Sequence, residues 1–295
     1  MRNVEKLIYE NERGETIEFS VNSVFHVNVD KDVSGLADIQ NEIYSISGME
    51  QDGETFIAAR IESRDIEIEG SIKERNKDKR ISLRRKLTHI MNPKQKAKLY
   101  YEYGDFRRVI GCVPENAPFF SKSDIYTDFS IQLVCSDPFW NEEFETREDI
   151  ATWIGAFEFP LEIPYDIGIE FGYRQLSLIV NVLNGGDVPC GIRVDFRALG
   201  TVTNPYLLNL ETREFIKFNN CELEAGDVLS ISTYYGKKSV TITHNGITTD
   251  AFRLLDVDST YIQLNVGDNL FRYDADSNLE NLEVSVYHND RFLGV

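Results

Sequence analysis

Hydrophobic and polar residues alternate with a period of two through most of this chain, a pattern that predicts β-strands with one buried face. The run 66–72 shows it best, because isoleucines stand at positions 66, 68 and 72 and Glu67 and Glu69 lie between them. Shorter runs predict further N-terminal strands at residues 7–9, 16–19, 56–61, 107–113 and 125–134.

One N-terminal segment follows a helical period instead. Apolar residues recur at helical spacing between residues 77 and 91, which predicts an amphipathic helix. Its polar positions include four basic side chains, Arg80, Arg84, Arg85 and Lys86. Asn92 followed by Pro93 is typical of a helix start, so we expect a second, short helical segment through Tyr101, ended by Gly104.

The C-terminal part is predicted to be nearly all strand. Alternating runs occur at residues 176–182, 192–196, 262–266 and 282–286. Between them, Asn245-Gly246 tolerates the positive φ values of a type I′ turn and predicts a tight hairpin. Strands at this spacing, separated by Gly, Asn and Asp turns, favour a β-sandwich of about 130 residues.

The length of 295 residues favours two domains. We expect a mainly β fold with one or two helices, in which residues 1–140 form the first domain and residues 153–295 the second. Residues 141–152, an acidic stretch behind Phe139-Trp140, are the predicted linker.

Charge is distributed unevenly along the chain. The formal net charge is −18, and residues 1–59, 60–110, 111–150 and 151–295 contribute −8, +7, −7 and −10. The acidic total argues against general nucleic-acid binding, which needs a basic face. We also expect no membrane helix and no signal peptide, because no run is apolar enough for either.

The basic stretch 73–98 has two interpretations that charge alone leaves open. It is either a solvated amphipathic helix or a docking surface for an acidic partner, such as a second copy of the chain. Acidic residues nearby (Glu62, Asp65, Glu67 and Glu74) supply the opposite sign for a repeating head-to-tail contact. Nucleic acid is a weaker candidate partner, because the stretch lacks interleaved aromatic residues.

Motifs for catalysis or cofactor binding are missing from the sequence. It contains no glycine-rich phosphate loop and no G-x-S-x-G motif. Residues 274–278 imitate the start of a calcium loop, but Leu279 and Ser285 stand where glycine and glutamate are needed, so a turn is favoured. We expect no cofactor and no enzymatic activity. A glycan hydrolase would need a carboxylate pair, which the sequence cannot show.

Residues that bind metals are scattered as well. The histidines (His26, His89, His244 and His288) form no i, i+4 pair, and the cysteines (Cys112, Cys135, Cys190 and Cys221) form no CxxC motif. We expect isolated thiols in a reducing compartment and no metal site. A zinc site assembled in space from these histidines and a cysteine stays open as a minor alternative.

Short motifs occur in a defined order along almost the whole chain. The N-terminal ones are Phe25-His-Val, Gly35-Leu36, IEIEG at 66–70 before the basic helix, Asn92-Pro93-Lys94, GDFRRVI at 104–110 and FSIQLVCSDPFW at 129–140. The C-terminal ones are AGDV at 225–228, GKKSVTI at 236–242, GDNLFRY at 267–273 and YHNDRFLGV at 287–295. In this order the chain resembles the distal tail proteins of long-tailed bacteriophages, the siphovirus tail-component family.

The resemblance implies an architectural protein of the virion tail, assembled in the bacterial host cytoplasm. Family members form a homo-hexameric ring that joins the tail tube to the baseplate or tail tip. The N-terminal domain, a small β-sandwich or barrel with a helix and a projecting hairpin, builds the ring. The C-terminal domain is a galectin-like β-sandwich, and its last strand could return to the first domain.

The resemblance also implies a set of partners. These are the tail-tube (major tail) protein, the tail-associated tip protein and the receptor-binding or other baseplate proteins, with no membrane. DNA is expected only in passage through the lumen. Acidic side chains of residues 1–59 and 111–150 would face that lumen, where like charges keep phosphates from binding.

A closed ring needs a heterologous contact, in which one surface meets a different surface of the next copy. The hairpin around 66–72 and the helix after it are the predicted contact. The candidate residues are Ile66, Ile68, Arg75, Arg80, Arg84, Arg85 and Lys86.

Two alternatives remain from the sequence. A carbohydrate-binding module could bind cell-wall glycans through surface aromatics of the C-terminal domain, Tyr234 and Tyr235, while Trp153 fits a core position equally well. The same kind of hub also occurs in prophages and in phage-derived tailocin particles, and the sequence does not separate these origins.

Overall fold

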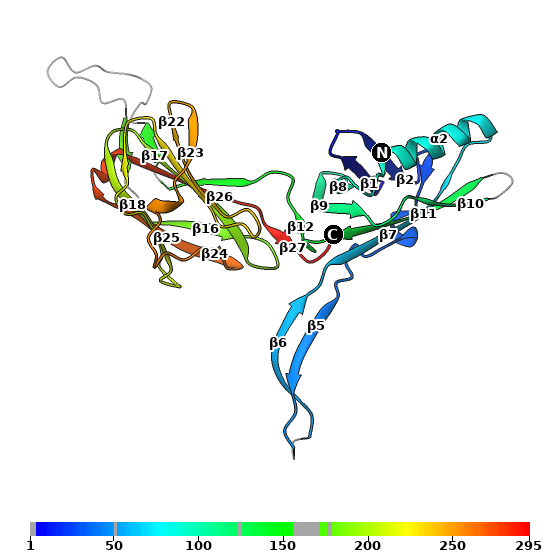
Figure 1. The fold of residues 1–295 in the computed structure, drawn as a ribbon, viewed down its shortest axis with the longest axis horizontal. Coiled ribbons are helices and arrows are strands. Elements are labelled where there is room, and N and C mark those ends of the chain that lie inside the picture. Colours follow the sequence, from blue (N-terminus) through cyan, green and yellow to red (C-terminus); the bar gives the residue numbers. More distant parts are fainter. Residues whose placement is uncertain (1–3, 50–51, 123–125, 151, 156–171, 176–178) are drawn as a thin grey trace. The chain divides into compact units, whose positions relative to one another are not determined.

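The computed structural model describes residues 4–49, 52–122, 126–150, 152–155, 172–175 and 179–295. The chain forms two compact units: unit 1 contains residues 1–143 and 291–295, and unit 2 contains residues 144–290 (Figure 1). Strands dominate both units, so the predicted mainly β fold class is confirmed. The boundary between the two units, after residue 143, falls within the predicted linker, residues 141–152.

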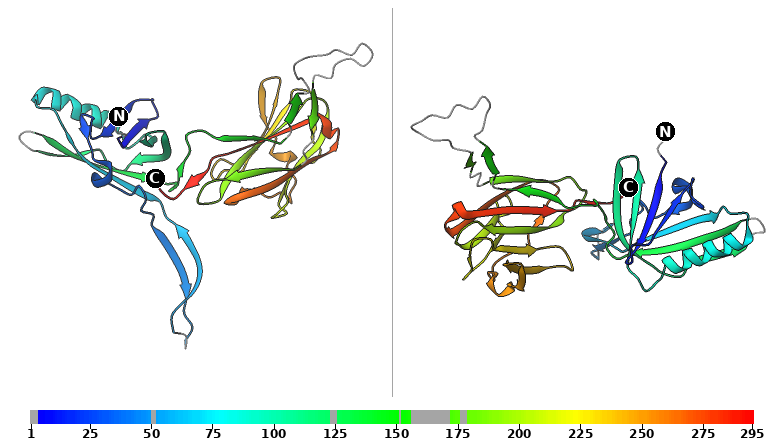
Figure 2. Two further views of the ribbon diagram at one scale, coloured as in Figure 1. Left: turned by 180° about the vertical axis from the view of Figure 1, so that it is seen from behind. Right: turned by 90° about the horizontal axis from the view of Figure 1, so that it is seen from above.

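The centre of unit 1 is a closed barrel of seven strands, in the order β11-β7-β3-β2-β1-β8-β9, with β9 pairing back to β11. Figure 2 shows this unit from two further sides. All neighbours are antiparallel except the parallel pair β2 and β3. The barrel strands are β1 (Lys6–Asn11), β2 (Thr16–Ser20), β3 (Phe25–His26), β7 (Arg64–Ile72), β8 (Ala97–Tyr103), β9 (Phe106–Pro114) and β11 (Thr127–Cys135). Short strands flank them: β4 (Val33–Ser34), β10 (Phe119–Lys122), β12 (Trp140–Asn141) and β27 (Arg291–Phe292).

The barrel core follows from the alternation seen in the sequence. Ile66, Ile68 and Ile72 point inward from β7 and are fully buried, as are alternate residues of β11. Gly70 interrupts the isoleucine series because the ring of Phe129, its cross-strand partner, occupies the space of a side chain there. A Cβ at Gly70 would lie 2.6 Å from Phe129 Cζ.

The described part of unit 1 contains the helices α1 (Val29–Asp32) and α2 (Lys77–Ile90), and α2 confirms the predicted amphipathic helix. Asn76 caps α2, because its side chain accepts hydrogen bonds from the backbone of Asp78 and Lys79. Leu87 and Ile90 are buried in the barrel core, whereas Ile81 is exposed.

The predicted helical segment from Asn92 to Tyr101 is wrong. The Asn92 side chain accepts a hydrogen bond from Lys94 N and so closes a turn, and strand β8 begins at Ala97. Leu99 and Tyr101 are buried and paired with β1, so the period of two, rather than the Asn-Pro signal, decided the structure.

A long hairpin leaves the barrel of unit 1 between α1 and β7. It consists of β5 (Asn41–Ile46) and β6 (Thr55–Ile61), which pair with each other and with no other strand among the described residues. Figure 1 shows it projecting away from the barrel. The sequence predicted β6 as a strand but not its partner β5.

Unit 2 is a sandwich of two antiparallel sheets, as predicted. One sheet has the order β13-β26-β17-β21-β22-β23, with β24 on β17, and the other β16-β25-β18-β19, with β20 on β18. The first contains β13 (Thr146–Asp149), β17 (Cys190–Ala198), β21 (Val228–Ser232), β22 (Ser239–His244), β23 (Ile247–Asp250), β24 (Gln263–Leu264) and β26 (Leu282–His288). The second contains β16 (Ile179–Asn184), β18 (Val202–Asn209), β19 (Phe215–Lys217), β20 (Glu222–Leu223) and β25 (Gly267–Ser277).

The core of unit 2 lies between these sheets and includes Val194, Phe196, Phe218 and Phe271. A separate pair, β14 (Thr152–Gly155) and β15 (Gly172–Gln175), also belongs to unit 2, as do the 3₁₀ turns Phe252–Leu254 and Leu279–Asn281.

Two local predictions for unit 2 can be compared directly with the structure. Asn245 and Gly246 both have positive φ and join β22 to β23, so the predicted tight hairpin is confirmed. The predicted turn at 274–278 begins later than expected, because residues 274–277 continue β25 and only Asn278 adopts the left-handed conformation.

Candidate assembly surfaces

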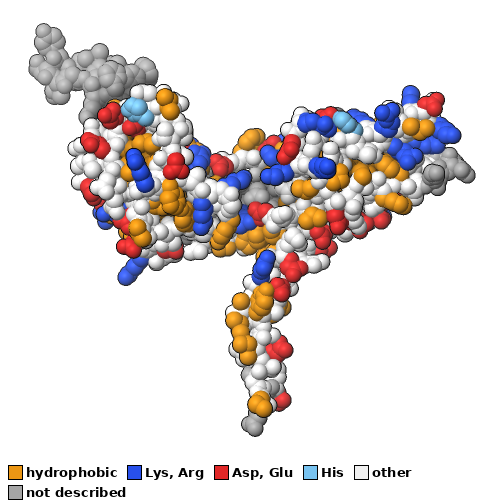
Figure 3. Space-filling view, viewed as in Figure 1, with side chains coloured by type: hydrophobic (Ala, Val, Ile, Leu, Met, Phe, Trp, Pro, Cys, Tyr) orange, Lys and Arg blue, Asp and Glu red, His pale blue; other side chains and the backbone are white. Residues whose placement is uncertain are grey.

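The β5–β6 hairpin exposes apolar side chains on both of its faces. The register places Ile43 beside Ala59 on one face and Tyr44 beside Ala58 on the other. Ile43, Ile46, Phe56 and Ile57 are each more than half exposed. Figure 3 shows hydrophobic side chains along the hairpin. An isolated two-stranded hairpin is marginally stable in water, so this surface is suited to being covered by a partner.

Arg64 anchors the base of the hairpin. Its side chain is only 2% exposed, although β7 begins at this residue directly after the hairpin. The guanidinium donates to the carbonyl oxygens of Gly35 at 2.8 Å and Leu36 at 2.7 Å, which precede the hairpin. It also donates to Pro138 O at 2.7 Å and to Leu293 O. Burial lowers the pKa of the Arg64 guanidinium from its usual value.

A second buried side chain, that of Trp140, also holds the chain at the base of the hairpin. Trp140 is fully buried, and its Nε1–H donates to Leu36 O at 2.9 Å. Leu36 O thus accepts hydrogen bonds from both Trp140 and Arg64, which holds the chain where it enters the hairpin. The sequence motifs contained Leu36 and Trp140, but only the structure shows that they meet, and Arg64 was not among the predicted site residues.

A basic surface covers α2. Arg85 and Lys86 are exposed, and Arg75 is exposed just before the helix. Arg84 is half-buried, with its guanidinium 4.8 Å from the centre of the Phe120 ring. An open groove of about 760 Å³ runs between α2 and β10 and is lined by Arg84, Arg85 and Phe120, among others.

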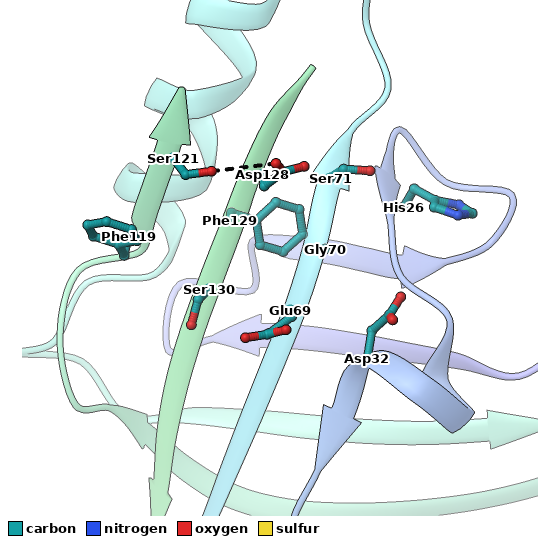
Figure 4. Close-up of a pocket in the computed structure, with 10 residues that line it drawn as sticks. All are labelled: His26, Asp32, Glu69, Gly70, Ser71, Phe119, Ser121, Asp128, Phe129 and Ser130. Carbon is teal, nitrogen blue, oxygen red and sulfur yellow. Dashed lines mark hydrogen bonds between the residues drawn. The ribbon is translucent and has the colours of Figure 1, made fainter. Parts of the chain in front are cut away.

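An acidic surface lies on the outer face of β7 and β11. Their outward positions carry Asp65, Glu67 and Glu69 on β7 and Asp128 on β11. A hollow of about 480 Å³ lies over this face. Figure 4 shows that Glu69, Asp128 and Asp32 lie around Gly70. Ser121 Oγ donates to Asp128 Oδ2 at 3.5 Å, and no Lys or Arg is among the described lining residues.

The structure corrects part of the predicted ring contact. Ile66 and Ile68 are 1% and 0% exposed inside the barrel, so they cannot contact a neighbouring molecule directly. They fill the core because inward positions of β7 face the barrel interior. The five basic candidates gather on and beside α2, with Arg75, Arg85 and Lys86 exposed and Arg80 and Arg84 half-buried.

The two aromatic candidates of unit 2 differ from each other. Tyr235 is 70% exposed, whereas Tyr234 is half-buried. Burial, with the nearby Glu145 carboxylate as a smaller cause, raises the pKa of the Tyr234 hydroxyl far above its usual value. Tyr234 is therefore not an open stacking surface, and the side chain of Trp153 lies outside the described residues.

A separate cluster in unit 2 brings together residue types that bind metal ions. Cys190, His288 and Asp290 each offer one donor atom, and these atoms lie within 4.8 Å of one another. The sequence gave no local spacing that pointed to this grouping, because Cys190 and His288 come from different strands.

Each of the two units contains a segment that matches a family model of phage tail proteins. Residues 12–135 match the family model of the phage tail protein RIFT-related domain. Residues 185–292 match that of the siphovirus-type tail component, C-terminal domain. The chain therefore belongs to the siphovirus tail-component family, and the resemblance to distal tail proteins seen in its motifs is confirmed.

Solved structures share the fold at low sequence identity. The crystal structure of the Dit protein (gp 19.1) of phage SPP1, described as a paradigm of the hub adsorption apparatus in phages that infect Gram-positive bacteria, matches with a TM-score of 0.69 and 12% identity. The match covers 97% of this chain and 99% of that one. A chain of the phage P2 baseplate in its activated conformation with Ca matches with a TM-score of 0.53 and 12% identity, over 98% of both chains.

The same baseplate with Sr matches with a TM-score of 0.53 and 11% identity, over 97% of this chain and 98% of that one. No protein of curated function matches the sequence. Within the part of the chain that the structure describes, no helix is long and apolar enough to cross a bilayer.

Proposed function

We propose that this tail protein is a distal tail hub: a homo-hexameric ring that joins the tail tube to the baseplate or tail tip and anchors host-adhesion components. The observation that supports it best is the β5–β6 hairpin, whose apolar side chains are exposed on both faces. Its base is held by the buried Arg64, so the hairpin presents a defined surface. Covering that surface with a neighbouring copy stabilises both partners.

Charge complementarity supports a contact between copies. Each copy carries a basic surface on α2 and an acidic surface on β7 and β11, which are different surfaces of one unit. A heterologous contact that closes into a ring requires two such different and complementary surfaces. In the proposed ring, Arg85 and Lys86 of one copy approach Glu69 and Asp128 of the next.

The remaining partners follow from the hub proposal. The ring would contact the tail-tube protein on one side and the tail-associated tip protein on the other, and unit 2 would carry receptor-binding or other baseplate proteins. DNA would pass through the lumen without binding, because the acidic segments 1–59 and 111–150 repel phosphates. The protein would assemble in the host cytoplasm and reside in the virion tail. A tailocin or prophage particle would use the same ring.

Sizing the purified full chain by light scattering tests the proposal. We expect particles of six times the chain mass of 33.9 kDa for the wild type. The double variant Phe56→Ser/Ile57→Ser should give monomers whose circular dichroism spectrum matches that of the wild type. The matched control is Ile247→Ser/Phe252→Ser, which removes exposed apolar side chains from unit 2 and should leave the hexamer intact. A hexamer that persists in the hairpin variant would contradict the role of the hairpin.

The carbohydrate-binding alternative receives less support from the structure. Of the two tyrosines that it requires, only Tyr235 is exposed. Isothermal titration of the full chain with cell-wall glycans, compared with Tyr235→Ala, would reveal such an activity.

A further inference from the structure

Cys190, His288 and Asp290 lie together in unit 2, and the strand register explains why. β17 and β26 are antiparallel with Ile192 opposite His288, so Cys190 lies diagonally across from His288 on the same face. Asp290 follows His288 by two residues and lies on that side as well. One donor atom from each of the three lies within 4.8 Å of the others.

The His288 ring nitrogen Nδ1 faces the Asp290 carboxylate. The His288 side chain is 2% exposed, and Nδ1 lies 2.9 Å from Asp290 Oδ1. The opposite ring nitrogen, Nε2, points away from Asp290, so an ion bound by both residues would lie at Nδ1 and replace the proton between Nδ1 and Oδ1.

The Asp290 carboxylate is also held in position. Its second oxygen, Oδ2, accepts a hydrogen bond from Gly185 N at 2.9 Å. Three segments that are distant in the sequence therefore converge: the loop at Gly185, the start of β17 and the end of β26. Asp290 is therefore held both by a backbone N–H group and by the His288 side chain.

A cysteine, a histidine and an aspartate can also form a catalytic triad, with the thiol as nucleophile. Burial argues against that reading here, because Cys190 is 0% and His288 2% exposed, and a substrate could not reach the sulfur. A metal ion needs no open cleft, since the protein encloses it.

We propose that Cys190, His288 and Asp290 bind one divalent cation, with Zn²⁺ the best match. Thiolate, imidazole and carboxylate are the groups that bind zinc, whereas a thiolate is too soft a ligand for Ca²⁺ or Mg²⁺. Donor atoms around one tetrahedral zinc lie roughly 3.5 Å apart. The cluster would need to contract by about 1 Å, which side-chain adjustment can supply.

A bound cation would tie the start of β17 to the end of β26. Because the ligands come together only in the folded unit, cation binding would raise the stability of unit 2. This inference does not depend on the hexamer, since all three ligands belong to one copy.

Titration of the metal-free full chain with Zn²⁺ and Co²⁺ tests the proposal. We expect one Zn²⁺ per chain by calorimetry, a higher melting temperature with Zn²⁺, and a thiolate-to-Co²⁺ charge-transfer band. Cys190→Ser should abolish that band, and Asp290→Asn should weaken Zn²⁺ binding by roughly 10–100-fold. Cys221→Ser is the matched control, because Cys221 is also buried in unit 2, and it should keep the band.

Circular dichroism of each variant confirms that it is folded before titration. Failure of the folded, metal-free wild type to bind either ion would overturn the proposal. The same Co²⁺ spectrum in folded Cys190→Ser would overturn it too, because the thiolate would then come from elsewhere. Unchanged Zn²⁺ affinity in Asp290→Asn would remove Asp290 from the site.

Discussion

Arg64 Nε donates a 2.7 Å hydrogen bond to the backbone carbonyl oxygen of Pro138, 74 residues away in the sequence. The same guanidinium binds the carbonyls of Gly35 and Leu36 at the entry of the hairpin. A buried cation is thus satisfied by main-chain oxygens that lie far apart along the chain. The proposed assembly arm therefore depends on one side chain that never reaches the surface.

Replacing Arg64 with lysine should loosen the base of the β5–β6 hairpin. Lysine lacks the planar fork that reaches several carbonyls at once, so we expect a loss of about 2–4 kcal/mol in the free energy of unfolding. Urea unfolding gives that value, and hydrogen exchange should quicken around Gly35 and Leu36. Arg60→Lys, on the exposed hairpin, is the control and should change stability by less than about 0.5 kcal/mol. Equal effects of the two variants would contradict the anchoring role.

Reversing two charges on α2 should dissociate the proposed ring. The double variant Arg85→Glu/Lys86→Glu places like charges opposite the acidic surface and should weaken each contact by about 1–2 kcal/mol. Mass photometry at low salt measures the hexamer fraction. The control Lys94→Glu/Lys96→Glu makes the same charge change just after the helix and should leave the ring intact.

Reversing the charges of the acidic surface as well tests whether α2 binds that surface. Adding Glu69→Lys and Asp128→Lys to the α2 variant should restore the hexamer, because opposite signs would face each other again. If the fourfold variant stays dissociated while folded, α2 does not bind this acidic surface.

Gly70→Ala should destabilise the barrel by about 1–3 kcal/mol, because overpacking forces neighbouring groups to move. The new Cβ would lie 2.6 Å from Phe129 Cζ and 2.7 Å from His26 O. Gly111→Ala is the control on β9, where nothing lies within 4 Å of the new atom. Thermal unfolding compares the two, and an equal loss in both would mean that the cost is not the contact with Phe129.

The stability of unit 1 should fall above pH 10. Burial, together with a 2.7 Å hydrogen bond to Glu10, raises the pKa of Tyr100 to about 12, and burial raises that of Tyr101 to about 12. A raised pKa keeps the proton on the folded form, so the stabilisation is complete below pH 10 and is lost as the pH rises through 12. Tyr100→Phe should flatten the decline of melting temperature over this range, and an unchanged slope would contradict the assignment.

Residue patterns were reliable where one local signal dominated. The alternation in residues 66–72 identified β7, and apolar spacing identified α2 almost to its last residue. The segment after Asn92 shows the limit: a cap-like pair suggested a helix, yet the alternate burial of Ala97, Leu99 and Tyr101 in the barrel made it a strand. Packing outweighed the local signal because burying those side chains contributes more than one capping bond.

Periodicity, local charge and motif order were sufficient to predict the two-part, mainly β organisation, the basic helix and the family. Which residues are available to a partner depends instead on the tertiary structure. It placed Ile66 and Ile68 in the core, exposed the β5–β6 hairpin, and brought Arg64 to Pro138 and Cys190 to His288. These contacts depend on strand register and barrel closure, which bring together side chains from distant parts of the chain.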